Sequence, residues 1–332
     1  MIGFCTSTRF FDHLTGPHHP ERPDRVRAIF AAVREAGMIN SPNPLSSEDL
    51  HFDLHLKDPP RLVEIRPRPA EVADILRVHP QRHVDRVRIR CQTGGQLDNG
   101  DTVVGHESYE IAMLAAGACL TCVDAVMKGE VARAFAAVRP PGHHAEPNAS
   151  MGFCLFSNVA IAAKYAQERY RLNRIAIVDF DVHHGNGTQA AFQSDASVLF
   201  ISVHEDPHLL YPGTGYDWEI GSGEGKGTTL NIPLPAESGD AAYLAAFRGK
   251  VIPSLHQFAP ELLFISAGFD AHDDDPLADM AVTDDGFYQM TRMLAEVADK
   301  HCAGRIVSVL EGGYNLRTLG RVVVQHLLAL DK

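Results

Sequence analysis

The sequence predicts a single α/β/α domain in which a mostly parallel sheet is covered by helices on both faces. Short apolar runs alternate with longer stretches of helical periodicity along most of the chain, a pattern typical of such sheets. The runs are continuously apolar, as expected of strands that are buried on both faces. No internal repeat, low-complexity tract or linker-like change of composition divides the 332 residues, so we expect one domain over residues 1–332.

The expected strands are runs of five or six residues, which is the usual length of a strand. They are Ala134–Val138, Ile175–Phe180, Val198–Val203, Leu230–Leu234, Leu262–Ala267 and Ile306–Leu310. Helical periodicity between them predicts helices at 159–169, 241–258 and 285–301. Residues 1–100 are less regular, with helix signals at 25–36 and 69–76 and proline-rich joints between them. We assign these residues to the same domain.

The amino-acid composition limits the classes of partner that the protein is expected to bind. Asp and Glu total 42 against 30 Lys and Arg, a net charge of −12, which argues against a general nucleic-acid binder because such proteins present a basic face. No uninterrupted apolar run reaches the ~18 residues of a membrane span, and no secretion signal is visible. The six cysteines are scattered, as in reduced cytoplasmic proteins. We expect a cytoplasmic protein without nucleic-acid or membrane partners, and leave its oligomeric state open.

Chemically versatile side chains directly follow four of the expected strands. They are His143 and His144 after the first run, Asp181 and His183 after the second, Asp270 after the fifth, and Tyr314 after the sixth. In open parallel sheets the ligand crevice lies just outside the carboxyl ends of the strands. Four segments that are distant in sequence are therefore expected to meet at one site.

Two of these segments together form a candidate metal site. Asp179, Asp181 and His183 share one side of an extended strand end, because side chains alternate along a strand. Asp181 and His183, joined by Asp270 from another strand end, make a three-ligand set with an open position, which suits Zn²⁺ or a similar divalent metal. A DxH pair alone could equally cap the following helix, so the interpretation depends on the other segments.

The adjacent histidines follow Arg139–Gly142, a proline-rich turn that presents both rings from a rigid backbone. Two histidines beside a metal can divide the work, one as a general base and one as a charged partner. Each ring then needs an acceptor that fixes its tautomer, and Asp179 and Asn186 are candidates.

A tyrosine follows the last expected strand in the segment Glu311–Asn315. A phenol at Tyr314 can donate to a developing oxyanion opposite the metal. The segments Met151–Cys154 and Tyr211–Gly215 contain aromatic residues that would either wall a narrow channel or belong to the core.

Six motifs occur in a fixed order over most of the chain. They are RPPGHH (139–144), GFC (152–154), DFDVHHGNGTQ (179–189), YPGTG (211–215), AGFDAH (267–272) and LEGGYN (310–315). This set resembles the zinc-dependent histone deacetylase superfamily, which includes bacterial acetylpolyamine amidohydrolases and acetoin-utilisation proteins. The GNG and AGFDA blocks are more similar to class II, including bacterial histone deacetylase-like amidohydrolases, than to class I. The resemblance implies the arginase/deacetylase-like α/β fold.

The resemblance also implies roles for individual residues. It implies one Zn²⁺ held by Asp181, His183 and Asp270. His144 would be the general base and acid, His143 its electrostatic partner, Asn186 and Asp179 their supports, and Tyr314 the oxyanion donor. A structural K⁺ would be held by Asp179, Asp181, His183, Ser202 and Val203. The substrate tunnel and rim would be formed by Gly152, Phe153, Tyr211, Leu277, Gly313 and Asp101, and Arg25 would lie below the site.

The implied activity is removal of acetyl or another short acyl group from the ε-amine of lysine in a protein or peptide. Tyr314 stands where some weakly active relatives have histidine, which favours a competent deacetylase. Leu277 occupies the position of a glutamate that selects polyamines in some relatives, which argues against that mode of selection. The acidic segment Asp273–Asp275 is expected near the tunnel mouth, where it would either attract a cationic substrate or be an ordinary solvated loop.

Three alternative functions remain open at this stage. An acetylpolyamine or another acetylated small amine as substrate would require no change in the chemistry. An arginase-like enzyme with two metals would need a carboxylate where this chain has Gly185. A non-catalytic acyl-lysine binding module would need no reactive side chains, whereas all of them are present.

Overall fold

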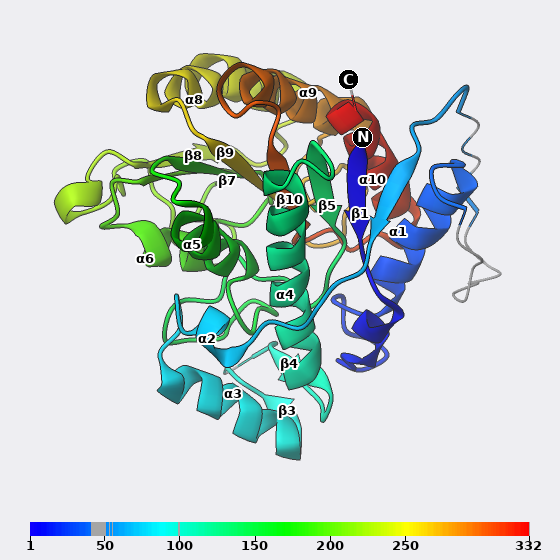
Figure 1. Ribbon diagram of the computed structural model, residues 1–332, viewed down its shortest axis with the longest axis vertical. Coiled ribbons are helices and arrows are strands. Elements are labelled where there is room, and N and C mark those ends of the chain that lie inside the picture. The colour runs from blue at the N-terminus through cyan, green and yellow to red at the C-terminus, as the bar shows by residue number, and fades with distance from the viewer. Residues whose placement is uncertain (41–50, 53, 55, 99, 332) are drawn as a thin grey trace.

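The computed structural model describes residues 1–40, 51–52, 54, 56–98 and 100–331 (Figure 1). Its centre is an eight-stranded sheet with the order β2-β1-β5-β10-β9-β6-β7-β8, and every neighbouring pair is parallel. The strands are β1 (Ile2–Cys5), β2 (Leu62–Ile65), β5 (Arg133–Ala136), β6 (Ile175–Asp179), β7 (Val198–Glu205), β8 (Thr229–Leu234), β9 (Leu262–Ala267) and β10 (Ile306–Leu310). The parallel sheet and all six expected strands are confirmed, with ends that differ by at most two residues.

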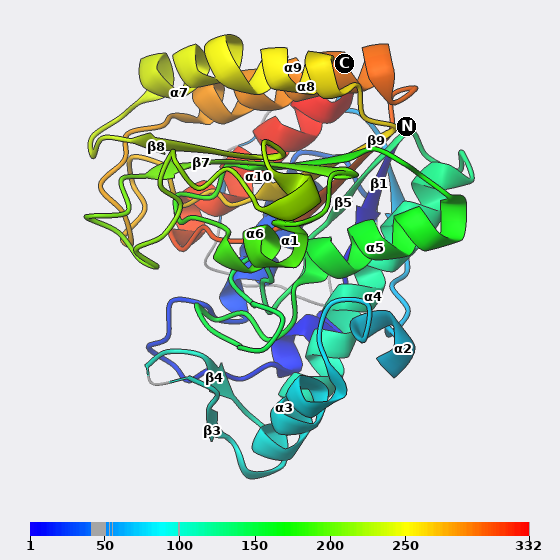
Figure 2. The same cartoon turned by 90° about the vertical axis from the view of Figure 1, so that its left-hand side faces the viewer.

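Helices cover both faces of this sheet, as the edge-on view in Figure 2 shows. One core cluster joins the sheet to α1 (Asp24–Glu35), α7 (Asp240–Ala246), α8 (Ile252–Phe258), α9 (Asp284–His301) and α10 (Leu316–Asp331). A second joins the opposite face to α4 (Ser108–Met127), α5 (Asn158–Tyr170) and α6 (Asn186–Phe192). The long helix expected at 241–258 consists of α7, a π-helical turn at Phe247–Val251, and α8.

Helix α4 is the most apolar helix in the described part of the chain that also has the length to cross a membrane. Of its apolar window, 78% is buried inside the protein, so its composition is explained by packing against the sheet and α5. Cys119 and Cys122 are both fully buried free thiols on this helix. The CxxC pair therefore serves helix packing.

The helix signals at 25–36 and 69–76 are confirmed as α1 and α2 (Val72–Ile75), whereas other elements in residues 1–104 left no sequence signal. These are β1, β2, a 3₁₀ turn at Thr8–Asp12, α3 (Gln81–Thr93) and the small hairpin of β3 (Gly95–Gln96) with β4 (Val103–Val104). Strands β1 and β2 are four residues long, too short for a periodic signal. Helix α3 exposes its arginines and buries Val84, Val87 and Cys91, so its apolar stripe is narrow.

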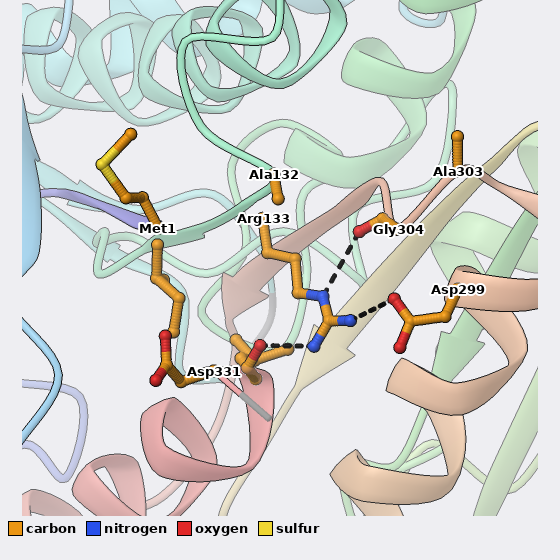
Figure 3. A pocket seen from close by; sticks show the side chains of 9 residues that line it. Met1, Ala132, Arg133, Asp299, Ala303, Gly304 and Asp331 are labelled. Carbon is orange, nitrogen blue, oxygen red and sulfur yellow. Dashed lines mark hydrogen bonds and ion pairs between the residues drawn. The ribbon is translucent and has the colours of Figure 1, made fainter.

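The two edges of the sheet have different roles. At the amino ends of the strands a pocket surrounds Arg133, whose guanidinium donates to the carbonyls of Gly304 and Leu330 and pairs with Asp299 (Figure 3). These contacts tie the carboxyl ends of α9 and α10 to β5, and they satisfy the buried guanidinium within the protein. The side chains singled out in the sequence lie at the opposite edge, beyond the carboxyl ends of the strands.

Candidate active site

The loops after β6 and β9 bring the three candidate metal ligands together. One ligand atom from each of Asp181, His183 and Asp270 lies within 4.8 Å of the others. His183 Nδ1 is 3.1 Å from Asp181 Oδ1 and 3.2 Å from Asp270 Oδ2. Both carboxylates are fully buried. Backbone N–H groups orient them: Gly312 donates to Asp181 Oδ2 at 2.8 Å, and Val182 donates to Asp270 Oδ1 at 3.0 Å.

The electrostatics of this group fit a divalent cation. Burial lowers the pKa of His183, but its hydrogen bonds to Asp181 and Asp270 outweigh burial and raise that pKa to about 10. The two buried carboxylates thus favour a positive charge beside them, which is either a proton on His183 or a metal cation that takes its place. Oxygen and nitrogen donors in this number match a catalytic zinc site with one open position. Gly312 permits the close packing, since a Cβ there would lie 2.0 Å from Asp270 Oδ2.

The two adjacent histidines each have one ring nitrogen fixed. His143 Nδ1 donates to Asp179 Oδ2 at 3.0 Å, and His144 Nδ1 donates to Asn186 Oδ1 at 2.8 Å. The ring centroids of His143 and His144 are 4.0 Å apart, and the His144 ring is 5.7 Å from that of His183. Asn186 in turn donates to Glu146 at 2.9 Å. The Nε2 atom of His144 is therefore left for chemistry.

These histidines have pKa values shifted in opposite directions. Burial lowers the pKa of His143, but the carboxylates of Asp181 and Asp179 outweigh burial and hold it well above its usual value. Burial and the positive charges of His143 and His183 hold the pKa of His144 well below its usual value. These opposite directions favour a protonated His143 beside a neutral His144, the division of work expected of a general acid–base site.

Aromatic rings surround the approach to His144. The Tyr211 ring lies 5.0 Å from the His144 ring and 6.4 Å from the His183 ring, and its side chain is 41% exposed. The rings of Phe153 and Tyr314 meet edge to face at 5.9 Å. Gly152, at φ +55°, passes so close to His144 that a Cβ would lie 2.3 Å from its ring. These aromatic residues therefore gather around His144, and Tyr211 is the one of them that is exposed.

Tyr314 is supported from below by a buried arginine. The Arg25 guanidinium lies 4.8 Å from the centre of the Tyr314 ring, and Nε donates to the Gly313 carbonyl at 2.6 Å. Burial raises the pKa of Tyr314 well above its usual value, so its hydroxyl keeps its proton. The sequence placed Arg25 below the site by resemblance alone, and the cation–π contact is what gives it a physical role.

The rim residues lie further out. Asp101 belongs to the loop before β4, and its backbone carbonyl accepts from His19 at 2.9 Å. The His19 ring also packs edge to face on the Phe153 ring at 4.8 Å, and the Phe153 N–H donates to the Thr102 hydroxyl at 3.1 Å, so this loop lies beside Phe153. Leu277 is half-buried in the loop before α9, with its N–H bonded to Asp275.

The residues assigned to potassium lie at the carboxyl ends of β6 and β7. Asp179 pairs with Ser202 in the sheet register, and all but His183 of the five assigned side chains are completely buried. The Ser202 hydroxyl is hydrogen-bonded to His204 Nδ1 at 2.8 Å. The Ser202 hydroxyl therefore already has a hydrogen-bond partner within the protein.

One expectation about the acidic segment is wrong. Asp273 and Asp274 are exposed, but Asp275 is only 7% exposed and turns into the protein. Its carboxylate accepts from the N–H groups of Tyr314 and Asn315. Burial of a carboxylate is favourable only with such partners, so Asp275 belongs to the support of the tyrosine loop and not to an acidic patch.

Sequence reasoning also missed two buried acidic side chains near the site, Glu311 and Glu21. Glu311 accepts backbone hydrogen bonds from the histidine turn. Glu21 pairs with Arg139 at 2.7 Å and with Arg25 at 3.3 Å, and burial of Glu21 is outweighed by Arg139, which lowers its pKa to about 2. The available signal was the position of Glu311, which directly follows the buried, mostly apolar strand β10.

Comparison with known proteins identifies the family. The model of the "Histone deacetylase domain" matches residues 19–330. The chain belongs to the histone deacetylase family. It is 39% identical to a probable deacetylase of Archaeoglobus fulgidus, covering 95% of this chain and 82% of that protein. It is also 39% identical to a histone deacetylase-like amidohydrolase of Pseudomonas aeruginosa, covering 92% and 81%.

A solved structure of similar sequence has the same fold as this chain. The crystal structure of the HDA15 HD domain superposes with a TM-score of 0.87 at 37% sequence identity, over 99% of this chain and 89% of that chain. The family recognised from the six motifs and the α/β fold are both confirmed, and the chain is a hydrolase of amide bonds. The arginase-like alternative also lacks room for its extra ligand, because a Cβ at Gly185 would lie 2.3 Å from Asp179 Oδ2.

Proposed function

We propose that this histone deacetylase-family protein is a zinc-dependent deacylase that removes acetyl or another short acyl group from the ε-amine of lysine side chains. The observation that carries the proposal is that His143 and His144, each with Nδ1 held by an acceptor, lie beside the buried group of Asp181, His183 and Asp270. Amide hydrolysis needs a base, an acid and stabilisation of an oxyanion within one small volume. This site contains all three.

The metal would be held by Asp181, His183 and Asp270. When bound there, Zn²⁺ polarises a substrate carbonyl and lowers the pKa of a coordinated water towards neutrality. The fully buried carboxylates and the half-buried imidazole leave one side of the group facing the aromatic approach, from which substrate would enter.

The protein's own residues move the protons. His144 Nε2 takes a proton from the attacking water, and its Nδ1 stays fixed by Asn186. The same nitrogen then protonates the leaving amine. His143, held protonated by Asp179, contributes fixed positive charge beside the reacting centre. The Tyr314 hydroxyl donates a hydrogen bond to the oxygen that becomes negative in the transition state.

The walls of the approach suit a lysine side chain. An extended butyl chain is apolar and narrow, and aromatic faces at Phe153 and Tyr211 would pack on its methylenes, with Gly152 at the inner end. Asp101 at the rim would accept hydrogen bonds from the backbone of a bound peptide. Leu277 would add an apolar contact at the mouth, in place of a carboxylate that would attract a second amine.

Turnover of two substrates tests the proposal. An acetyl-lysine peptide and N-acetylputrescine are compared in kcat/KM, each with metal-loaded and with chelator-stripped protein. We expect metal-dependent turnover of the peptide and little turnover of the polyamine. The reverse preference would assign the protein to polyamine metabolism. Tight binding of the acetylated peptide without turnover would identify a binding module and overturn the proposal.

We also assign a structural K⁺ to the junction of β6 and β7. Its ligands would come from Asp179, Asp181, His183, Ser202 and Val203. Support comes from the burial of these residues at adjacent strand ends. An ion there predicts a higher melting temperature in KCl than in NaCl of equal ionic strength, and equal melting temperatures would count against it.

A further inference from the structure

The two halves of the proposed catalytic apparatus come from neighbouring strands. The histidine turn follows β5, and the tyrosine loop follows β10; these strands pair in parallel and lie side by side (Figure 1). Pairing between β5 and β10 ends at Ala136 and Val309, although β10 stays paired with β9 as far as Leu310. Beyond these residues the two segments are no longer paired with each other, so the sheet alone does not fix the position of His144 relative to Tyr314.

One buried carboxylate spans this gap. Glu311 Oε2 accepts from the N–H groups of Gly142 and His143 at 2.7 and 3.1 Å. Its Oε1 accepts from the Ser266 hydroxyl at 3.3 Å. Glu311 is completely buried and stands three residues before Tyr314. The side chain thus holds the backbone of one catalytic segment while its own backbone belongs to the other.

A second set of contacts, made by Arg25 and Glu21, also links the histidine turn to the tyrosine loop. The Arg25 guanidinium donates to the carbonyl oxygens of Glu311 and Gly313 at 2.5 and 2.6 Å. It also pairs with Glu21, which holds Arg139 at the start of the histidine turn. Every charged group in this network is buried, where such hydrogen bonds are strong and their loss is costly.

We propose that Glu311 is a positioning residue that sets the distance between the histidine pair and the oxyanion-donating tyrosine. This inference rests on the proposed deacylase function. The side-chain hydrogen bonds of Glu311 go to Gly142, His143 and Ser266 and to none of the candidate metal ligands, so the carboxylate acts through the backbone of the histidine turn. A displacement of about 1 Å in a catalytic group can cost roughly 10²-fold in rate. Loss of this carboxylate is expected to act on kcat and to leave substrate binding largely unchanged.

Three substitutions at one position separate positioning from charge. Glu311→Gln keeps an acceptor oxygen of the same reach, so we expect kcat within about tenfold of the wild type. Glu311→Ala removes the acceptor, and kcat is expected to fall by about 10²-fold with KM changed less than threefold. Glu311→Asp is one methylene shorter and cannot reach both amides, so its kcat is expected to lie between those of the other two.

The control is a glutamate with the same kind of contact elsewhere. Glu261 Oε2 accepts from two consecutive N–H groups, Asn173 and Arg174, at 2.7 and 2.9 Å, at the other end of β6. Glu261→Ala removes a pair of backbone hydrogen bonds of the same geometry, at a half-buried position away from the site. We expect its kcat to equal that of the wild type.

Hydrogen–deuterium exchange supplies a readout that does not depend on activity. In Glu311→Ala, peptides covering residues 139–146 are expected to exchange faster, while those of β6 and β9 remain unchanged. In Glu311→Gln these peptides should exchange nearly as in the wild type. The measurement is made on metal-free and on zinc-loaded protein, and it distinguishes this inference from the proposed function, because it stands even if the wild type turns over no lysine substrate.

Several results would overturn the inference. A kcat for Glu311→Ala within threefold of the wild type would show that the carboxylate sets nothing of catalytic importance. An equal loss in Glu311→Gln and Glu311→Ala would assign the effect to charge. Faster exchange throughout the protein, or a lost melting transition in all three variants, would make Glu311 a general structural residue.

Discussion

The carboxylate of Asp275 accepts hydrogen bonds from the backbone N–H groups of Tyr314 at 2.6 Å and of Asn315 at 3.3 Å. A third N–H, that of Leu277, donates to its other oxygen at 3.1 Å. Asp275 and Glu311 thus perform the same task on two segments, since each is a buried acid that accepts paired amides. Burial, and then the charge of Asp270, raise the pKa of Asp275 to about 7.

Removal of this acceptor should therefore misplace the tyrosine. We expect Asp275→Ala to lower kcat by roughly 10- to 100-fold, because two N–H groups that hold the Tyr314 loop lose their partner. Asp275→Asn retains an acceptor oxygen and should lose less. Steady-state kinetics on the acetyl-lysine peptide measure the effect. The exposed neighbour Asp274→Ala serves as the control, and a matching loss there would show that the acidic segment acts through its charge.

The Tyr314 hydroxyl is expected to contribute more to kcat than Asp275, which supports the tyrosine loop. Tyr314→Phe removes only the hydroxyl, leaving the ring packed against Phe153 and Arg25. We predict a fall in kcat of ~10²–10³, the usual cost of one oxyanion donor, with little change in KM. Near-normal turnover in this variant would exclude Tyr314 from the mechanism.

The candidate catalytic residues could be predicted from the sequence, whereas the residues that hold their loops in position could not. The residues that carry chemistry, such as Asp181 and His183, follow apolar strands, and the geometry of parallel sheets brings such positions together. Asp275 and Glu311 act on backbone N–H groups of other segments. Nothing in their own sequence neighbourhood indicates which amide they will meet, because that depends on how irregular loops fold over one another.

The strands of the sheet also differ in how far the sequence predicts them. Strands β5 to β10 were predictable because each contains or overlaps a mainly apolar run of five or six residues, whereas β1 and β2 have four residues each. Two of the four residues of the edge strand β2, Val63 and Glu64, are exposed. Its place in the sheet comes from pairing with β1, a tertiary contact that leaves no local periodicity.

Metal removal gives a prediction that is independent of turnover. We expect chelation to abolish activity and lower the melting temperature, because a ligand that binds only the folded state stabilises it by mass action. Titration of Zn²⁺ into stripped protein should show one high-affinity site per chain, lost in Asp270→Ala. Restoration of activity by Zn²⁺ completes the test, and a stoichiometry of two would favour a dinuclear enzyme instead.

The buried His326 predicts a specific dependence of stability on pH. Its two ring nitrogens bond to the hydroxyls of Thr291 and Ser308 at 2.8 and 2.9 Å, and burial lowers its pKa to about 3. Between pH 6.5 and 3 the unfolded chain binds a proton at this position that the folded protein does not. The contribution of His326 to the free energy of unfolding therefore falls as pH decreases, by about 1.4 kcal/mol per pH unit in that range.

The variant His326→Gln isolates this contribution because glutamine does not titrate. Urea unfolding of wild type and variant at pH 7.5, 6.5, 5.5 and 4.5, chosen as about one-unit steps across the window, gives the difference in free energy of unfolding. We expect the advantage of the wild type to be constant above pH 6.5 and to shrink steadily below it. Val322→Ala, a fully buried change that removes no titrating group, should show the same penalty at every pH. A His326→Gln difference that stays flat down to pH 4.5 would mean that the folded protein accepts the proton at His326, against the burial of that ring between two hydroxyl groups.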